Sequence, residues 1–289
     1  MAPMFNAEEL AIIRRAYARQ VMWAGQATSP ALEDAYAAVR RETYLGAGPW
    51  PIFRWAGGYQ MTPDADPAWL YSDVLVGIAT ARKLNNGQPS AHATWIDAAA
   101  PKPGDHVVHV GAGVGYYSAI MAHMAGSTGT LTAIEIDPDL ACRAAANLAH
   151  LENVQVIQGD GSLASFAPAD VIYVNAGASR PAEAWLDGLK DGGRLILPLT
   201  TDANFGIGIT EPSGAVFLIT RQGGVFDAEF VGPIAVFPCE SARDEASERA
   251  LAEAFAKGGF KQVKRLQRTA DVLDADCWVK APGWSLTYH

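Results

Sequence analysis

The stretch HVVHVGAGVGYYSAI, residues 106–120, decides the fold of this chain. A mainly apolar run of five residues is followed at once by Gly111, Gly113 and Gly115. This pattern is typical of a strand that turns tightly into a helix, where glycine lets the backbone come close to a bound nucleotide-like cofactor. The stretch therefore predicts a strand at 106–110 and a helix at 115–125.

The residues that follow alternate between short apolar runs and helical segments. We expect strands at 130–136, 154–160, 170–177 and 192–199, and helices at 139–151 and 180–189. Short, continuously apolar strands are expected when helices cover both faces of a parallel sheet. The sequence therefore predicts an α/β fold with a doubly wound, mostly parallel, Rossmann-like sheet.

The flanking regions differ in character. Asn6 is placed to cap a helix at 7–24, a second helix is expected from Pro30 through 41, and 45–70 is expected to be an ordered loop. Beyond 200 we expect an antiparallel pair within 206–221, a helix ending at Gly258 and edge strands that extend the same sheet. This suggests an N-terminal helical cap and loop at 1–70, a cofactor-binding core at 71–200 and a β-rich extension with one helix at 201–289.

Composition argues against several classes of function, although a local basic patch at 257–268 stays open. The chain has 289 residues and a net charge of -9, which disfavours nucleic-acid binding through phosphate neutralisation. No apolar run approaches the ~18 residues of a membrane span. The three cysteines are far apart and the histidines form no H-E-x-x-H pattern, so we expect no metal and a cytoplasmic protein with reduced thiols. The sequence leaves the oligomeric state open.

Two acidic residues follow the glycine turn at the ends of successive strands. Tyr116 stands where a dinucleotide fingerprint needs its third glycine, so the pattern fits S-adenosylmethionine better than a dinucleotide. Glu135 is placed to accept hydrogen bonds from both ribose hydroxyls, and Asp160 to accept one from the adenine amino group.

With these motifs in order, the chain resembles the protein L-isoaspartate O-methyltransferases. VVHVGAGVGYYSAIMAHM, TAIEIDPDL, NVQVIQGDG and LKDGGRLILPL follow that family's cofactor motifs in order and spacing. Upstream, AYAAVRRETYL resembles a helix that ends in the family's Val-Pro-Arg-Glu, with Arg40 in place of the proline. The resemblance covers 29–200, and more weakly 214–238.

The resemblance implies methyl transfer from S-adenosylmethionine to a side-chain carboxylate, the isoaspartyl residue of aged proteins, with S-adenosylhomocysteine as product. A set of residues is expected to bind the cofactor: Gln88, Gly111, Ala112, Gly113, Gly115, Tyr116, Glu135, Ile136, Asp160, Gly161 and Asn175. We expect Asn175 and His92 also to face the substrate. His109, where related enzymes carry an acid, is expected to be a core histidine.

The chain departs from the family in its substrate loop, LNNGQPSAHA at 84–93. Aligning Gln88 on the family's glutamine puts Asn85, Asn86 and Gly87 in place of Thr-Ile-Ser. Gly87, at the position of the functional serine, then offers only its N–H, and the asparagine amides are candidate donors to a carboxylate. A second alignment puts Ser90 on that serine. We therefore take Asn85, Asn86, Gly87 and Ser90 as the candidate catalytic residues, and an Asn-Gly turn without a role is the alternative.

A carboxylate acceptor needs no general base, because with an ordinary pKa of ~4 it is already ionised at neutral pH. Other functions stay open at this point. The same fold could methylate a dedicated peptide or small molecule, and the chain could bind the cofactor without catalysis. A nicotinamide oxidoreductase is disfavoured by Tyr116.

Overall fold

The computed structural model describes residues 4–54, 56–201, 214–234, 236–239 and 241–289. The fold divides into two units. The first comprises Met1–Gly104 with Ala112–Gln158, and the second comprises Asp105–Gly111 with Gly159–His289. The strand before the glycine turn therefore belongs to the second unit. The three-part division expected from the sequence followed the order of residues along the chain.

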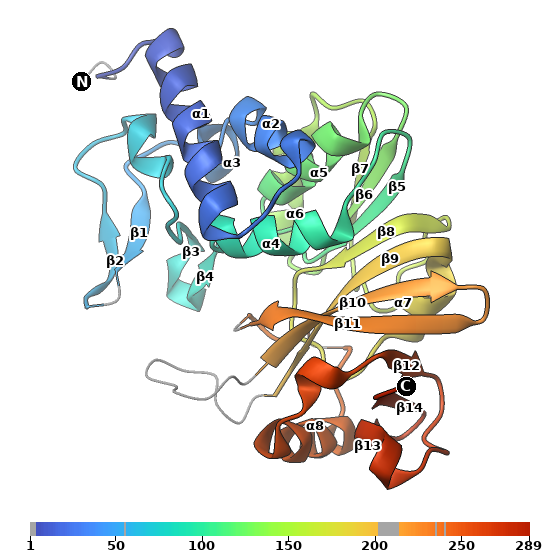
Figure 1. Ribbon diagram of the computed structural model, residues 1–289. Coiled ribbons are helices and arrows are strands. Elements are labelled where there is room, and N and C mark those ends of the chain that lie inside the picture. Colours follow the sequence, from blue (N-terminus) through green and yellow to red (C-terminus); the bar gives the residue numbers. More distant parts are fainter. Residues whose placement is uncertain (1–3, 55, 202–213, 235, 240) are drawn as a thin grey trace. The chain divides into compact units, whose positions relative to one another are not determined.

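The first unit begins with helices that pack on one another: α1 (Ala7–Ala24), α2 (Pro30–Ala38) and, later in the chain, α4 (Pro89–Ala99) (Figure 1). The Asn6 side chain accepts hydrogen bonds from the backbone N–H groups of Glu8 and Glu9, and the Glu9 carboxylate accepts from the Asn6 N–H. The predicted N-cap and helix 7–24 are therefore confirmed.

The second helix is shorter than the sequence suggested. It ends at Ala38, because Val39 is extended and turns the chain inward. Arg41 is consequently fully buried, and its guanidinium donates to the carbonyls of Leu70, Ser72 and Val74.

Residues 45–70, expected as a loop, contain regular structure. The helix α3 (Glu42–Leu45) leads to the antiparallel strands β1 (Pro51–Arg54) and β2 (Gly58–Met61), and a 3-10 turn, η1, follows at Pro67–Leu70. The strands were missed because they are short and rich in glycine and proline. A cross-strand aromatic pair, Phe53 with Tyr59 at 5.4 Å, helps to hold them together.

The remaining elements of the first unit carry the glycine turn and the substrate loop. β3 (Gly77–Ala79) and β4 (Leu84–Asn85) pair antiparallel around a 3-10 turn, η2 (Thr80–Arg82). After the turn come α5 (Tyr116–Ala125), β6 (Thr130–Glu135), α6 (Pro138–Leu148) and β7 (Val154–Gln158), and β6 and β7 run parallel. These elements agree with the prediction to within a few residues.

The second unit is built on a sheet with the strand order β13-β14-β12-β11-β10-β9-β8-β5. β5 (His106–Val110), β8 (Ala169–Val174) and β9 (Leu189–Thr200) are parallel, and α7 (Glu183–Gly188) connects the last two. The α/β class and the predicted strands are confirmed. The sheet is parallel only in this part.

From β9 onward the sheet is antiparallel. β10 (Gly214–Gln222) and β11 (Val225–Pro233) pair with each other, and β12 (Arg265–Gln267), β14 (Trp284–Thr287) and β13 (Cys277–Ala281) follow. The helix α8 (Glu245–Lys257) ends at Gly258 as expected, and short 3-10 turns lie at Phe260–Gln262 (η4) and Asp274–Asp276 (η5). The extension of the sheet is therefore confirmed. The first strand of the pair expected at 206–221 lies outside the described residues.

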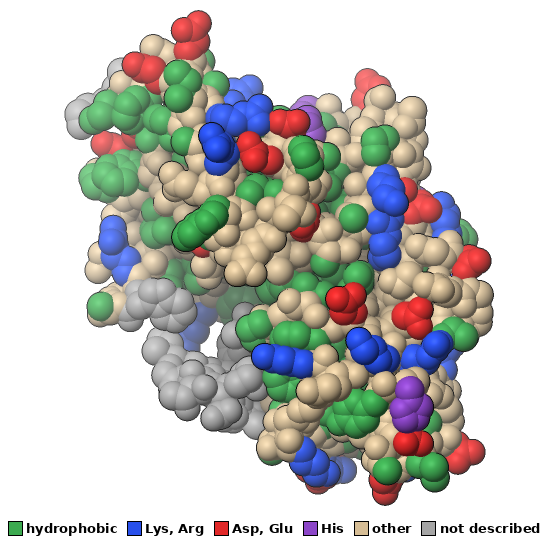
Figure 2. Space-filling view, viewed as in Figure 1, with side chains coloured by type: hydrophobic (Ala, Val, Ile, Leu, Met, Phe, Trp, Pro, Cys, Tyr) green, Lys and Arg blue, Asp and Glu red, His purple; other side chains and the backbone are tan. Residues whose placement is uncertain are grey.

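On the face shown in Figure 2, basic side chains are interspersed with acidic ones. Among the described residues there is no helix long and apolar enough to cross a membrane. The same part of the chain contains no cluster of three or more His, Cys, Asp or Glu side chains that could hold a metal ion.

Candidate active site

In the first unit, Glu135 binds the backbone of the glycine turn. Glu135 is the last residue of β6 and its side chain is 5% exposed. One carboxylate oxygen accepts the Gly113 N–H at 2.7 Å, and the other accepts the Asp137 N–H at 3.0 Å. Burial raises the pKa of Glu135, although these N–H donors act in the opposite direction. The carboxylate therefore fixes the turn and retains lone pairs that could accept ribose hydroxyls.

Gly113 and Gly115 have different surroundings. Gly113 has a φ of +57°, and among the described residues a Cβ at this position would meet nothing closer than Ile78 at 3.8 Å, so these residues leave space beside its backbone. Gly115 has a φ of +90° and caps α5, and a Cβ there would lie 2.8 Å from Leu148. Gly113 thus fits the predicted close approach of a ligand, whereas Gly115 is needed for helix packing.

Tyr116 lies in the core rather than at a surface. Its side chain is 1% exposed, and its ring packs edge-on or tilted against Tyr36 and Tyr44. Its hydroxyl lies 3.5 Å from the hydroxyl of Tyr17. Ile136, which follows Glu135, is 46% exposed, as a side chain that contacts a flat ligand ring would be.

The second unit holds Gly111, Asp160, Gly161 and Asn175 of the predicted cofactor residues, whereas Gln88 and Ala112 belong to the first. Gly111 has a φ of +76°, and a Cβ there would lie 3.0 Å from the carbonyl oxygen of Asn175. The Asn175 side-chain amide donates to the Gly111 carbonyl at 3.3 Å. The end of β8 therefore packs closely on the end of β5 and fixes both residues.

Asp160 and Gly161 follow β7 in the chain. Burial alone would raise the pKa of Asp160, but hydrogen bonds from Ser241 and from the backbone and hydroxyl of Ser162 lower it below its usual range. Asp160 is therefore an ionised acceptor. Gly161 has no room for a side chain, because a Cβ would lie 2.4 Å from Val110. Ser241 lies in the C-terminal extension, and no sequence signal linked it to the motif.

His109 is the expected core histidine. It is fully buried on β5, with its ring edge-on to Tyr173 at 5.3 Å. Burial lowers the pKa of His109 to about 3, so the imidazole is neutral at physiological pH.

In the substrate loop, Gly87 does not offer its N–H to a ligand as the sequence suggested. That N–H donates to Asn85 Oδ1 at 2.9 Å, and the Gly87 carbonyl accepts from the Tyr117 hydroxyl at 3.2 Å. Asn86 is 7% exposed, and its side-chain nitrogen is buried without a hydrogen-bond partner among the described residues. An unsatisfied buried donor costs about 1–3 kcal/mol of stability. A ligand that accepted a hydrogen bond from the Asn86 nitrogen would remove this cost.

Gly87 has a φ of +75°, and the space beside it is occupied by His92. A Cβ at position 87 would lie 2.2 Å from His92 Nε2. The His92 imidazole in turn stacks on the Tyr117 ring, with centroids 3.5 Å apart and planes at 8°. His92 is 2% exposed on α4. The imidazole therefore fills the region that a serine side chain at 87 would need.

Ser90 and Gln88 are both bound to Asp73, a residue that sequence reasoning missed. The Ser90 hydroxyl and N–H donate to the Asp73 carboxylate at 2.6 and 2.8 Å, and the Gln88 amide donates at 2.9 Å. Asp73 thus stabilises the first turn of α4, where the backbone dipole favours negative charge. A substrate carboxylate at Ser90 would meet this negative charge.

The fold defines the class of protein. The fold matches that of a solved protein-L-isoaspartate O-methyltransferase with a TM-score of 0.63 and 18% identity. The match covers 95% of this chain and 87% of the solved one. A second match, with a TM-score of 0.60 and 18% identity over 78% of the chain and 97% of the partner, is a putative enzyme of the same name from Plasmodium falciparum, in complex with S-adenosyl-L-homocysteine. The fold is thus that of a Rossmann-like methyltransferase.

Sequence comparison then gives the family. The model of the protein-L-isoaspartate(D-aspartate) O-methyltransferase family matches residues 63–216. A protein-L-isoaspartate O-methyltransferase of Ignicoccus hospitalis is 37% identical over 139 residues, which are 47% of this chain and 65% of that protein. The chain belongs to the protein-L-isoaspartate(D-aspartate) O-methyltransferase family.

Proposed function

We propose that this chain is an S-adenosylmethionine-dependent O-methyltransferase that esterifies the side-chain carboxylate of isoaspartyl residues in proteins or peptides. The observation that carries the proposal is the Glu135 carboxylate bound to the N–H of Gly113, beside open space, within the segment that the family model matches. The cysteines Cys142, Cys239 and Cys277 are all free, which supports a location in the reducing environment of the cytoplasm.

The residues present fit the cofactor when each unit is taken by itself. In the first unit, Glu135 would hold the ribose, Gly113 would admit the ligand to the backbone and Ile136 would contact the adenine. In the second, Asp160 would accept the adenine amino group, while Gly111, Gly161 and Asn175 shape the backbone. S-adenosylmethionine supplies a methyl group on a sulfonium, and the acceptor carboxylate supplies the ester oxygen.

This chain's residues would act by binding and orientation. No base is needed, because the acceptor carboxylate, with an ordinary pKa of ~4, is ionised at neutral pH. Alignment of reacting groups can contribute about 7–11 kcal/mol. For the carboxylate we favour Asn86 over Gly87 and Ser90, since the Gly87 N–H and the Ser90 hydroxyl are already donated within the protein.

A second function is favoured by one observation. His92 occupies the space beside Gly87, so the substrate loop has a different shape from one that carries a serine there. The chain could therefore methylate a dedicated peptide or small molecule instead of generic isoaspartyl sites.

Matched peptides that differ only in isoaspartate or aspartate test the proposal. The protein is incubated with S-adenosylmethionine and each peptide, and methyl esters are detected by mass spectrometry. We expect methylation of the isoaspartyl peptide alone. No ester on either peptide, with cofactor binding confirmed by calorimetry, would contradict this acceptor and favour the second function.

The placement of the cofactor has its own control. Gly113→Trp would fill the open space beside Gly113, and the left-handed backbone there disfavours any side chain. Calorimetry with S-adenosylhomocysteine should show loss of binding. Unchanged affinity would contradict the placement.

A further inference from the structure

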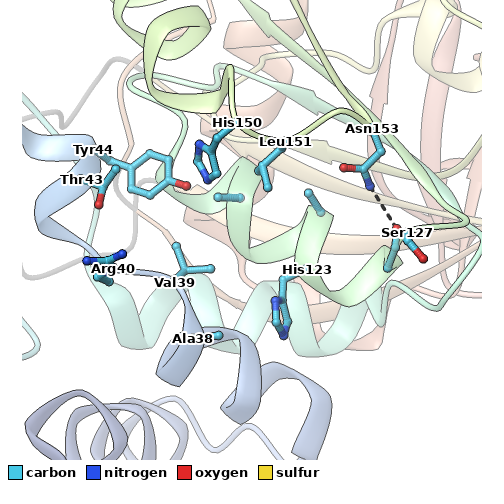
Figure 3. Close-up of a pocket in the computed structure, with 13 residues that line it drawn as sticks. Ala38, Val39, Arg40, Thr43, Tyr44, His123, Ser127, His150, Leu151 and Asn153 are labelled. Carbon is cyan, nitrogen blue, oxygen red and sulfur yellow. Dashed lines mark hydrogen bonds between the residues drawn. The ribbon is translucent and has the colours of Figure 1, made fainter. Parts of the chain in front are cut away.

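The first unit contains a cavity that none of the predicted site residues lines. Its volume is about 690 Å³, within the range of about 300–1,000 Å³ usual for small-molecule sites. Figure 3 shows His150 and Leu151 along one wall, Ala38 and Val39 along the other, and Tyr44 between them. Its lining comes from the end of α2, from α3, from α5 and from the residues that follow α5 and α6.

This cavity lies at the opposite end of the strands from the glycine turn. Ser127 and Asn153 lie just before β6 and β7 begin, whereas Glu135 lies where β6 ends. A ligand in this cavity would therefore not overlap the part of the proposed cofactor site that Glu135 and Gly113 form.

The ionisable side chains that line the cavity are mainly basic. Its titratable side chains are Arg40, Tyr44, His123 and His150, and it includes no Asp or Glu. This contrasts with the whole chain, whose net charge is -9. The two acids adjacent in sequence to lining residues, Glu42 and Glu152, do not line the cavity, and Glu42 accepts a hydrogen bond from the Tyr71 hydroxyl. The cavity thus offers a cation and two imidazoles to an anion.

Arg40 and Arg41 are adjacent but have different roles. Arg41 is fully buried and donates to three backbone carbonyls, so its guanidinium is committed to the fold. Arg40 is exposed, lines the cavity, and makes no side-chain hydrogen bond or ion pair within the described part of the chain. It also stands where the family motif has proline, so its guanidinium is a feature of this chain.

The floor of the cavity is apolar. Ala119 and Ala122 on α5 are almost fully buried, and Leu151, Val39 and the ring of Tyr44 complete the surface. Hydroxyl groups of Thr43 and Ser127 also belong to the lining. An apolar floor beneath a cationic rim suits a molecule with an apolar body and an anionic end.

We propose that this cavity binds a small phosphate monoester with an aromatic or apolar group. The phosphate would lie at the rim against Arg40, which can donate two parallel hydrogen bonds, with imidazole and hydroxyl donors around it. The apolar group would lie on the alanine floor beside Tyr44.

Phenyl phosphate is the probe. Phenol and inorganic phosphate, which each carry one half of the probe, are the control ligands. Calorimetry on the full chain should show saturable binding of phenyl phosphate that exceeds that of either half. Saturating S-adenosylhomocysteine should leave this binding unchanged, because the cavity is separate from the Glu135 turn. Absence of saturable binding at millimolar probe, or displacement by S-adenosylhomocysteine, would overturn the proposal.

Two arginine variants locate the binding. Arg40→Gln should weaken phenyl phosphate binding about tenfold or more through loss of a charge-assisted hydrogen bond. Arg19→Gln is the matched control, since Arg19 is exposed on α1 and does not line the cavity. The side-chain NMR signals of His123 and His150 should shift on titration, and that of His289 should not. Equal affinities for the two variants would refute the assignment.

Discussion

A serine at position 87, where one of the two alignments places the family's serine, should destabilise this protein. Gly87 has a φ of +75°, and a side chain in this left-handed region costs about 1–2 kcal/mol. The new Cβ would also lie 2.2 Å from His92 Nε2, and overpacking of this kind costs about 1–3 kcal/mol more. We therefore expect Gly87→Ser to lower the free energy of unfolding by about 2–5 kcal/mol.

The two contributions can be separated by a matched variant. Gly192 also has a φ of +75°, but a Cβ there would meet nothing within 4 Å. Gly192→Ser should therefore show only the backbone part. Urea denaturation of both variants, followed by circular dichroism, gives the difference, which we expect to be about 1–3 kcal/mol.

The role of His92 is tested by a double-mutant cycle. In a His92→Ala background the clash is absent, so Gly87→Ser should there cost no more than Gly192→Ser does in the original chain. The coupling energy between the two sites should be about 1–3 kcal/mol. If Gly87→Ser costs the same in both backgrounds, within about 0.5 kcal/mol, the argument from His92 is refuted.

Three more substitutions test the site and its surroundings. Glu135→Gln leaves one oxygen for two N–H groups, so calorimetry should show S-adenosylhomocysteine binding weakened about tenfold or more, and unchanged affinity would exclude Glu135 as a cofactor residue. The pKa of His109 is lowered to about 3 in the fold against about 6.5 unfolded, so its contribution to stability is present above pH 6.5 and is lost as the pH falls toward 3. At pH 5 the loss is about 2 kcal/mol, and denaturation curves of His109→Phe should lack it; the same slope in the variant would assign the effect elsewhere. Ser90→Ala removes a donor from Asp73 and should lower stability by about 1–2 kcal/mol while the KM for an isoaspartyl peptide changes by less than about threefold; a large rise in KM would restore Ser90 as a substrate residue.

The sequence was informative where structure depends on neighbouring residues. The strands from β5 to β9 contain apolar runs, and the helix between β6 and β7 begins at a recognisable cap, Asp137. The glycine turn and the acid after it also followed from local spacing. These features could be predicted because each strand, helix and turn carries its own pattern of residue types within a short window of the chain.

The substrate loop could not be predicted in the same way. Ser90 is bound by Asp73, 17 residues earlier, and Gly87 is bound by Tyr117, 30 residues later. Whether a hydroxyl or an N–H is free for a ligand depends on such distant partners. The strands β1 and β2 were missed because they are short and lie in a stretch rich in glycine and proline.

The hydrogen bond from the Gly87 N–H to Asn85 has a consequence for the chemical ageing of the protein. In an Asn-Gly pair, the glycine nitrogen readily attacks the asparagine side chain to form a succinimide, which opens to isoaspartate. Here that nitrogen donates its hydrogen to Asn85, and Asn86 is 7% exposed. The clamped turn therefore slows deamidation at Asn86. A protein proposed to recognise isoaspartate thus shields from that damage the dipeptide in its own substrate loop that is most prone to it.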